Sequence, residues 1–595
     1  MPSSTKLTRA LVDTAMGRVP ADTVIRNGKW VCVQSGEIIP KTDIAIKDRH
    51  VAYVGEDASH AIGKKTKVID AKGRYLVPGL LDGHMHVESG MVTVTEFVRA
   101  VAVRGTTGMF IDPHEIANIF GLKGVKLMVD EAQQQPIHVW VQMPSCVPSA
   151  PGFETPGATI GPKEVEQAMM WKGIIGLGEM MNFPGVFMGD RKMLKEMSVA
   201  HAHNKTIGGH YASPDLGLPF HGYVAGGAED DHEGTRKEDA VARVRQGMKS
   251  MLRYGSAWFD VAPQVGAITE LGLDSRHFML VTDDSHAQTI SQDGHMDRVL
   301  RHAIEQGLDP MTAIQMMTIN TAEHFGVSRE MGMIAPGRWA DVVLVKDLKK
   351  FKADMVIAKG QVIAESGKWK VALPKFSYPA WATNSVHLKK PLKKEDFKLW
   401  VTGQKSKVRA NVIGIIENQA PTRHLTFDVH PVDGEIKPDI KRDIAKVAIV
   451  KRHNGTNGIS VGLVSGFGFK SRCAIATTVA HDSHHMIVVG TDEASMAVAG
   501  NALVRSGGGQ VVVKDGKVIG KVELKIAGLM SNEKADVVAR KAETVLKGFR
   551  SCGCKLNNPN IQLSFLALVV IPELRISDMG LVDVTQFKFI PVLEG

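Results

Sequence analysis

The sequence predicts an α/β protein built around a (β/α)8 barrel, with a small β domain and a further α/β domain attached. Three observations support this prediction. The chain has 595 residues, too many for one hydrophobic core, so two to four domains are expected. Between Leu76 and about Phe325, strand-like runs alternate with helix-like runs, as in such a barrel. Histidines and carboxylates stand at the ends of nearly all the strand-like runs.

Short strands and turns dominate the sequence on either side of the barrel. Before it, residues from about 20 to 75 include Asn27-Gly28, a strong hairpin signal. After it, the strand-like runs GMIAPGRWADVVLVK and KADMVIAKGQVI include a turn at Pro336-Gly337. We expect residues 1–75 and 326–390 to form one composite β domain around a barrel of residues 76–325.

The remainder of the chain predicts a separate domain. A stretch rich in Lys and Pro near residues 385–400 is typical of a linker. Residues 400–595 contain the strand-like runs VGLVSGFGF and SGGGQVVVKDGKVIG and the helix-like run NEKADVVARKAETVLKGF. This composition predicts a C-terminal α/β domain.

Composition excludes several classes of protein. The chain has no apolar run of about 18 residues and no apolar leader at its N-terminus, so neither a membrane partner nor secretion is expected. Five cysteines, an odd and sparse set, favour a reducing compartment and hence the cytoplasm. The formal charge is +9, but the lysines are dispersed and not interleaved with aromatic residues, so no nucleic acid partner is expected.

The barrel strands are predicted from apolar runs followed by polar residues. In chain order the expected strands are LLDGHMHV, TTGMFID, IHVWVQM, GIIGLGEM, KTIGGHY, a poorly marked sixth near GYVAGG, SAWFDV and HFMLVTDD. Helix-like runs between them include PKEVEQAMMWK, DRKMLKEMSVAHAHN and KEDAVARVRQGMKSMLR.

The first of these strands has an unusual polar face. Because strand side chains alternate, Asp82, His84, His86 and Glu88 are expected to point the same way. Burying such a face is costly unless it binds something. Later strands end in further polar residues: Asp112, His114, Glu115, Glu179, His210, His232, Glu233, Asp283 and Asp284. Since the carboxyl ends of barrel strands meet at one mouth, these side chains are expected to converge.

Imidazoles and carboxylates in this pattern indicate one or two divalent transition metals, with the carboxylates favouring Mn or Fe over Zn. The predicted ligands are His84, His86, Glu179, His210, His232 and Asp283. Other interpretations remain open for single residues: Glu179 as an acid at a helix N-terminus, and His114 with Glu115 as the start of a helix. His201 and His203 are not expected to bind metal, because residues i and i+2 of a helix do not share a face.

The sequence resembles the amidohydrolase superfamily and, within it, the bacterial adenine deaminases. The superfamily motifs are VPGLLDGHMH, the strand-end histidines and Asp283, and IAPGRWADVVLV. The adenine deaminase motifs are GHMHVESGM, IDPHEIAN, MPSCVPSAPGFET, GLGEMMNFPGV, HEGTR, VTDDSH, GLVSGFGF, TVAHDSHHMIVVG, GGGQVVVKDGKV and IAGLMS. The resemblance runs from about residue 20 to the end of the chain.

The resemblance implies a metal-dependent hydrolase barrel with a binuclear centre and a C-terminal domain of the adenine deaminase type. It implies hydrolysis of adenine to hypoxanthine and ammonia, with two divalent ions, Mn²⁺ foremost and Fe²⁺ or Zn²⁺ as alternatives. Glu179 stands where many relatives carry a carboxylated lysine, so it is expected to bridge the metals. The purine base is the expected partner, and a homo-oligomer, a dimer, is the expected assembly.

The expected chemistry is attack of a metal-bound hydroxide on C6 of the purine. An acid near N1 is needed, and either Glu115 or Glu179 could supply it. Asp283 would carry the proton from the water to the departing ammonia, Asp284 would orient this transfer or bind the base, and His114 is a further site residue.

Two departures from the family pattern keep an alternative open. Ser285 stands where Arg is usual, and Gly90 where Ser is common. A related amidohydrolase acting on an N6-substituted adenine, an amide or a lactam is therefore the competing hypothesis. His481, Asp482, His484 and His485 form a C-terminal cluster that either caps the barrel mouth or forms a local polar network.

Overall fold

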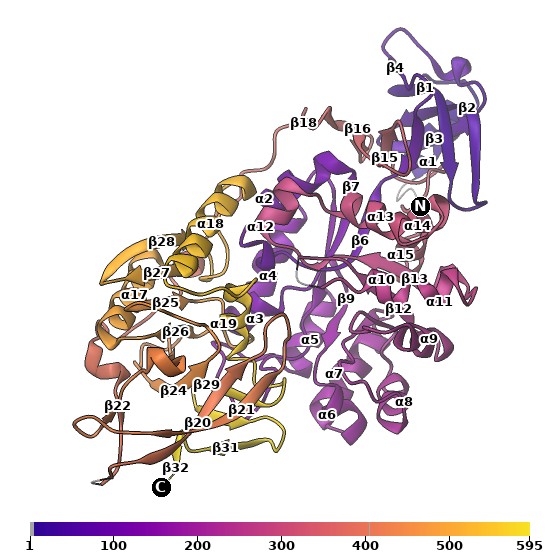
Figure 1. The fold of residues 1–595 in the computed structure, drawn as a ribbon. Helices are drawn as coiled ribbons and strands as arrows, with labels where there is room; N and C mark the ends of the chain where they lie inside the picture. Colours follow the sequence, from indigo (N-terminus) through magenta and orange to yellow (C-terminus); the bar gives the residue numbers. More distant parts are fainter. Residues whose placement is uncertain (1–4, 257, 404, 595) are drawn as a thin grey trace.

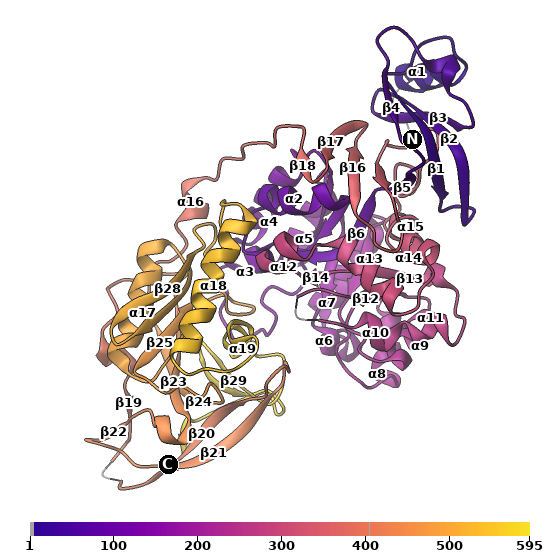
Figure 2. The ribbon, with the colours of Figure 1, turned by 45° about the horizontal axis from the view of Figure 1, so that its top comes forward.

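The structure is a computed structural model that describes residues 5–256, 258–403 and 405–594. Figure 1 shows a central barrel and, beside it, a β sheet formed by the segments that precede and follow the barrel in the chain. A C-terminal α/β part lies on the other side. Figure 2 shows the long connection from β18 (Lys368–Trp369) through α16 (Ala380–Thr383) to this last part.

The barrel is a ring of parallel strands, as predicted. Its strands are β6 (Leu80–His86), β7 (Thr106–Ile111), β8 (His138–Met143), β9 (Ile174–Met180), β10 (Thr206–Gly209), β11 (Asp230–Asp231), β12 (Lys249–Arg253) and β13 (Phe278–Val281), which continues as β14 (Asp283–Asp284). The order β10-β9-β8-β7-β6-β14 forms one parallel sheet and β11-β12-β13 a second. The ring closes where β14 pairs with β6 and where the Glu229 N–H donates to Ile207 O at 2.9 Å.

Helices surround the strands. They are α2 (Val94–Val101), α3 (His114–Phe120), α4 (Leu122–Ala132), α5 (Pro162–Met169), α6 (Phe183–Met188), α7 (Arg191–Ala202), α8 (Leu218–Ala225), α9 (Lys237–Arg245), α10 (Val261–Gln264), α11 (Gly266–Thr269), α12 (Ala287–Gln292), α13 (Met296–Glu305), α14 (Pro310–Met316) and α15 (Ile319–His324). Phe110 stacks on Phe325 inside the ring at 4.0 Å between centroids, so aromatic side chains fill part of the barrel interior.

Two predicted strands are wrong. The run GYVAGG is the last part of α8 with the turn that follows it. The helix has Pro219 in its first turn, where the missing N–H costs nothing, and the sixth strand is the two-residue β11. The run SAWFDV, of which Ala257 lies outside the described residues, follows the seventh strand, β12. The residues of β12 were predicted as helix, but α9 ends at Arg245 and Gly247, at φ +87°, cannot continue it.

The β sheet beside the barrel combines both flanking segments. It contains β1 (Thr23–Cys32), β2 (Glu37–Lys47), β3 (His50–Gly55), β4 (Lys67–Asp70), β5 (Tyr75–Pro78), β15 (Val342–Val345), β16 (Ala353–Ala358), β17 (Gln361–Glu365) and β18. β15 pairs antiparallel with β5, which joins the two segments. The predicted hairpin at Asn27-Gly28 is wrong: β1 runs through it with a bulge, and a Cβ on Gly28 would lie 2.3 Å from Leu76.

The C-terminal part is a mixed sheet with helices on both faces. Its main strands are β20 (Val408–Ile415), β21 (Thr422–Val429), β23 (Ile444–Val450), β24 (Ile459–Ser465), β25 (Cys473–Thr477), β26 (Met486–Gly490), β27 (Gly509–Lys514) and β28 (Lys517–Glu523). Along β27, Val511 and Val513 share the cluster of α17 (Glu493–Ser506), whereas Val512 packs with α18 (Ala535–Ser551). The loop of residues 478–485, between β25 and β26, faces the barrel.

Two further features concern the cysteines and the helices. All five cysteines are free and buried. In the part of the chain that the structure describes, no helix has the length and apolar character needed to cross a bilayer.

One buried carboxyl outside the barrel mouth makes stability depend on pH. Glu196 on α7 is fully buried, and neither of its oxygens has a hydrogen-bond partner among the described residues. Burial raises the pKa of Glu196 to about 8. The folded state therefore keeps a proton that the unfolded state releases above its pKa of 4.5. Stability should fall as the pH rises through this window.

We predict that Glu196→Gln raises the midpoint of thermal unfolding more at pH 8.5 than at pH 5, because the neutral amide removes the cost of ionisation. Thermal unfolding of both proteins at the two pH values measures this. An equal shift at both pH values would contradict it.

Candidate active site

All six predicted metal ligands converge at the carboxyl ends of the barrel strands. His84 and His86 end β6, Glu179 lies on β9, His210 and His232 follow β10 and β11, and Asp283 begins β14. Five of them are buried, and the side chain of His210 retains 23% exposure. The His86 Nε2 lies 3.3 Å from Asp283 Oδ1, and the rings of His84 and His232 stack at 3.9 Å.

Glu179 stands at the centre and presents its two oxygens to different groups. Oε1 lies 3.7 Å from His86 Nε2 and 3.2 Å from His114 Nδ1. Oε2 lies 2.7 Å from His210 Nδ1 and 3.1 Å from His232 Nε2. Burial alone would raise the pKa of Glu179, but His210 and the other imidazoles hold it well below its ordinary range. A carboxylate placed in this way is able to share its oxygens between two cations.

Neighbouring groups fix the orientation of these side chains. The His86 Nδ1 lies 2.9 Å from Asp112 O, which leaves Nε2 facing the site. The Asp112 carboxylate accepts the Glu179 backbone N–H at 2.7 Å. Such outer hydrogen bonds are typical of metal ligands. Asp82, by contrast, binds Thr282 and lies 3.1 Å from His295, so it does not join His84 and His86 in the centre.

Arg253 is a site residue that the sequence analysis missed. It ends β12, and its guanidinium lies 2.9 Å from Asp283 Oδ2 and 2.8 Å from Asp260, with Glu233 also in contact. Its charge holds the pKa of Glu233 at about 2 against the effect of burial. An arginine at a strand end was a visible signal, but the run was predicted as helix.

The donor set fits divalent cations. The His84 Nε2 is buried without a hydrogen-bond partner among the described residues, although it points at carboxylates 3.9 Å away. Imidazole nitrogens mixed with carboxylate oxygens suit Mn, Fe or Zn. A buried polar atom without a partner needs an explanation, and a bound cation would supply one here.

His114 and Glu115 begin α3 and also face the site, so the two interpretations of this pair are compatible. Burial raises the pKa of Glu115 to about 7. Burial and the nearby Glu115 charge raise the pKa of Glu88 to about 8. Ser89 Oγ donates to Asp284 and lies 3.4 Å from Glu115 Oε1. The mouth thus contains carboxyl groups able to hold a proton near neutral pH.

The loop of residues 478–485 closes over these groups. His484 Nε2 lies 3.7 Å from Glu115 Oε2, and His481 with Asp482 lies next to His114. His485 faces away, with Nε2 2.8 Å from Thr155 O. The structure therefore places three members of the C-terminal cluster at the barrel mouth and the fourth in the domain contact.

The two departures from the family pattern lie beside the site. Ser285 is buried, and a Cβ on Gly90 would lie 3.0 Å from the Phe97 ring and 3.4 Å from Ser285 O. Gly90 therefore relieves a tight contact in this chain. His201 and His203 lie at the end of α7, away from the centre, as expected.

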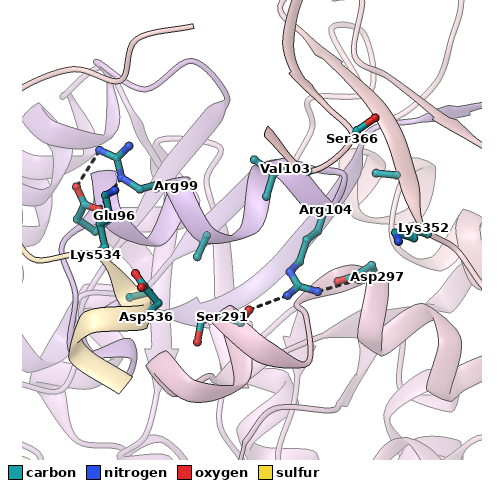
Figure 3. Close-up of a pocket in the computed structure, with 14 residues that line it drawn as sticks. Glu96, Arg99, Val103, Arg104, Ser291, Asp297, Lys352, Ser366, Lys534 and Asp536 are labelled. Carbon is teal, nitrogen blue, oxygen red and sulfur yellow. Dashed lines mark hydrogen bonds and ion pairs between the residues drawn. The ribbon is translucent and has the colours of Figure 1, made fainter. Parts of the chain in front are cut away.

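A cavity of about 420 Å³ lies elsewhere, where α2, the turn after β17 and the start of α18 meet (Figure 3). No histidine lines it. Its arginines are already held: Arg99 by Glu96 at 2.7 Å, and Arg104 by the Ser291 carbonyl at 2.8 Å. This cavity is separate from the metal-ligand cluster.

Comparison with known proteins agrees with this arrangement. Residues 75–363 match the amidohydrolase family and residues 419–588 the adenine deaminase C-terminal domain. The chain is 58% identical to adenine deaminase 3 of Rhizobium meliloti over 98% of both chains. It is 59% identical to an adenine deaminase of Mesorhizobium japonicum over 98% of this chain and 96% of that one. An adenine deaminase of Moorella thermoacetica is 50% identical over 99% of this chain and 98% of that one. This similarity covers both matched regions and nearly the full length of the chain. The chain therefore belongs to the adenine deaminase family of amidohydrolases.

Proposed function

We propose that this protein is an adenine deaminase, which hydrolyses adenine to hypoxanthine and ammonia. The observation that carries the proposal is the convergence of the six predicted metal ligands, Glu179 among them, in a chain that belongs to the adenine deaminase family. Nothing in the comparisons favours the alternative substrates.

We propose that the site would hold two divalent cations, Mn²⁺ foremost and Fe²⁺ or Zn²⁺ as alternatives, and that Glu179 would contribute to holding both. They would supply a water that ionises near neutral pH. His84 and His86 would hold one cation and His210 and His232 the other, with Asp283 beside them.

The remaining groups of the mouth have separate tasks in the proposed reaction. Attack at C6 places negative charge on N1, and a protonated Glu115 is suited to neutralise it. Asp283, with one oxygen held by Arg253 at 2.9 Å, would move a proton from the attacking water to the leaving ammonia. Asp284, bound by Ser89 and by Trp258 Nε1 at 3.2 Å, would keep this transfer aligned. His114 lies beside Glu179 and would line the substrate pocket.

The proposal includes the wider context predicted from the sequence. We place the enzyme in the cytoplasm, in the salvage of purine bases, as a homodimer. Its proposed domains are the composite β domain of residues 1–75 and 326–390, the catalytic barrel of residues 76–325, and the C-terminal domain of residues 400–595. We call the last one the covering domain, because its loop of residues 478–485 lies over the barrel mouth.

The first test is ammonia release from adenine by protein produced with iron chelated and manganese supplied, with metals counted per chain. We expect rapid release and about two metals. N6-methyladenine and simple amides serve as comparison substrates. Two metals with turnover of a comparison substrate but none of adenine would overturn the proposal.

We predict that Glu179→Ala lowers the metal content to one per chain or less, because both cations share this carboxylate. Elemental analysis and the rise in unfolding temperature on adding Mn²⁺ are the measurements. Glu196→Gln, which alters a buried glutamate on α7 outside the cluster of predicted ligands, is the control. Retention of two metals by Glu179→Ala would show that Glu179 is not the bridge.

We predict that kcat falls above about pH 7, where Glu115 loses its proton, given its pKa of about 7. Glu115→Gln should lower kcat by about 10²–10⁴-fold and remove this alkaline limb. The pH–rate profiles of the two proteins measure this. A limb that persists in Glu115→Gln would assign the acid to another group.

A further inference from the structure

We propose that Asp482, from the C-terminal domain, accepts a hydrogen bond from the imidazole-ring N–H of the purine and thereby restricts the enzyme to free bases. The inference rests on the proposed function and adds a recognition residue from outside the barrel. The ring N–H distinguishes adenine from N9-substituted purines, nucleosides included, which have none.

The Asp482 carboxylate has one occupied and one available oxygen. Oδ1 lies 3.4 Å from His481 Nδ1. Oδ2 is buried and no described residue donates a hydrogen bond to it; the nearby Ser149 hydroxyl donates to Glu154 Oε1 at 2.8 Å instead. The residue as a whole is only 3% exposed. An unpaired buried carboxylate oxygen is costly, so a donor that arrives with a ligand would stabilise it.

The position of Asp482 fits the far end of a purine. His114, His481 and Asp482 bring one nitrogen or oxygen each within 4.8 Å of one another. His114 Nδ1 in turn lies 3.2 Å from Glu179 Oε1, at the metal-ligand cluster. If C6 faces that cluster, the imidazole ring of the base extends toward the covering loop, where Asp482 lies.

The same loop also contributes a defined donor. The Ala480 N–H donates to His484 Nδ1 at 3.2 Å. In the neutral ring, the proton must then be on Nε2, which lies 3.7 Å from Glu115 Oε2. Arg452 fixes the loop by donating to the His484 carbonyl, and to Ser385 O at 2.9 Å. The backbone of the loop is therefore held in place where it contacts the barrel mouth.

The expected consequence is strong discrimination. A site built to bond a substrate N–H rejects an analogue that lacks it by up to about 10⁴–10⁵-fold, because the buried acceptor is left unpaired. A 9-substituted purine would turn an alkyl group or a nitrogen lone pair toward the carboxylate. Removing the carboxylate should therefore weaken the binding of adenine and leave the binding of the 9-substituted purine nearly unchanged.

The test compares wild type with Asp482→Ala and Asp482→Asn, using the KM for adenine and the inhibition constant of 9-methyladenine in the same assay. We expect Asp482→Ala to raise the KM for adenine at least tenfold with little change for 9-methyladenine. Asn keeps an acceptor oxygen and should fall between. The control is Asp578→Asn. This buried aspartate lies in the same domain contact, 2.9 Å from Lys451, and its substitution should leave the preference for adenine over 9-methyladenine unchanged.

Several outcomes would overturn the inference. An equal loss for both compounds would show a merely structural role for Asp482. Loss of a metal ion in Asp482→Ala would show that His114, His481 and Asp482 hold a third cation instead. If wild type releases no ammonia from adenine, the proposed function itself fails; if wild type is active and the preference survives in Asp482→Ala, only this inference fails.

Discussion

The site depends on one constraint: a buried carboxylate must remain ionised among several imidazoles. Glu179 meets His210 and His232 at one oxygen and His86 and His114 at the other. Burial opposes its charge, so the arrangement is stable only if positive charge surrounds it. Five strands of a closed ring end at this point, which lets residues far apart in sequence meet that requirement with rigid backbone behind each side chain.

The covering domain sets the electrostatics of the mouth. Glu88 and Glu115 have pKa values of about 8 and about 7, and in both cases burial is the largest cause. The C-terminal loop contributes to that burial, since His484 lies 3.7 Å from Glu115. In a barrel open to water the pKa values of these acids would stay near 4.5, and both carboxyl groups would be ionised at neutral pH. The covering domain is therefore part of the chemistry.

The sequence predicted those site residues that a local spacing pattern can identify. Histidines two apart on an apolar strand, and single polar residues after later strands, identified all six converging residues. The prediction failed at β11 and β12, because a two-residue strand has no periodicity and because Arg253 was assigned to a helix that ends before Gly247. The contact of His484 with Glu115 joins residues 369 positions apart, and no local pattern encodes it.

The cost of holding the covering loop indicates what the loop is for. Arg452 is fully buried, and within the described part of the chain its guanidinium donates to neutral oxygens of His484, Ser385 and Ala527. Burial lowers the pKa of Arg452 to about 9. A buried guanidinium without a carboxylate partner is expensive, and a hydrophobic residue would join the same segments at lower cost. What Arg452 provides instead is direction, because several donors in one plane fix the loop backbone from several sides. In the proposed reaction, the barrel would act on C6 while this rigid second surface would meet the opposite end of the base.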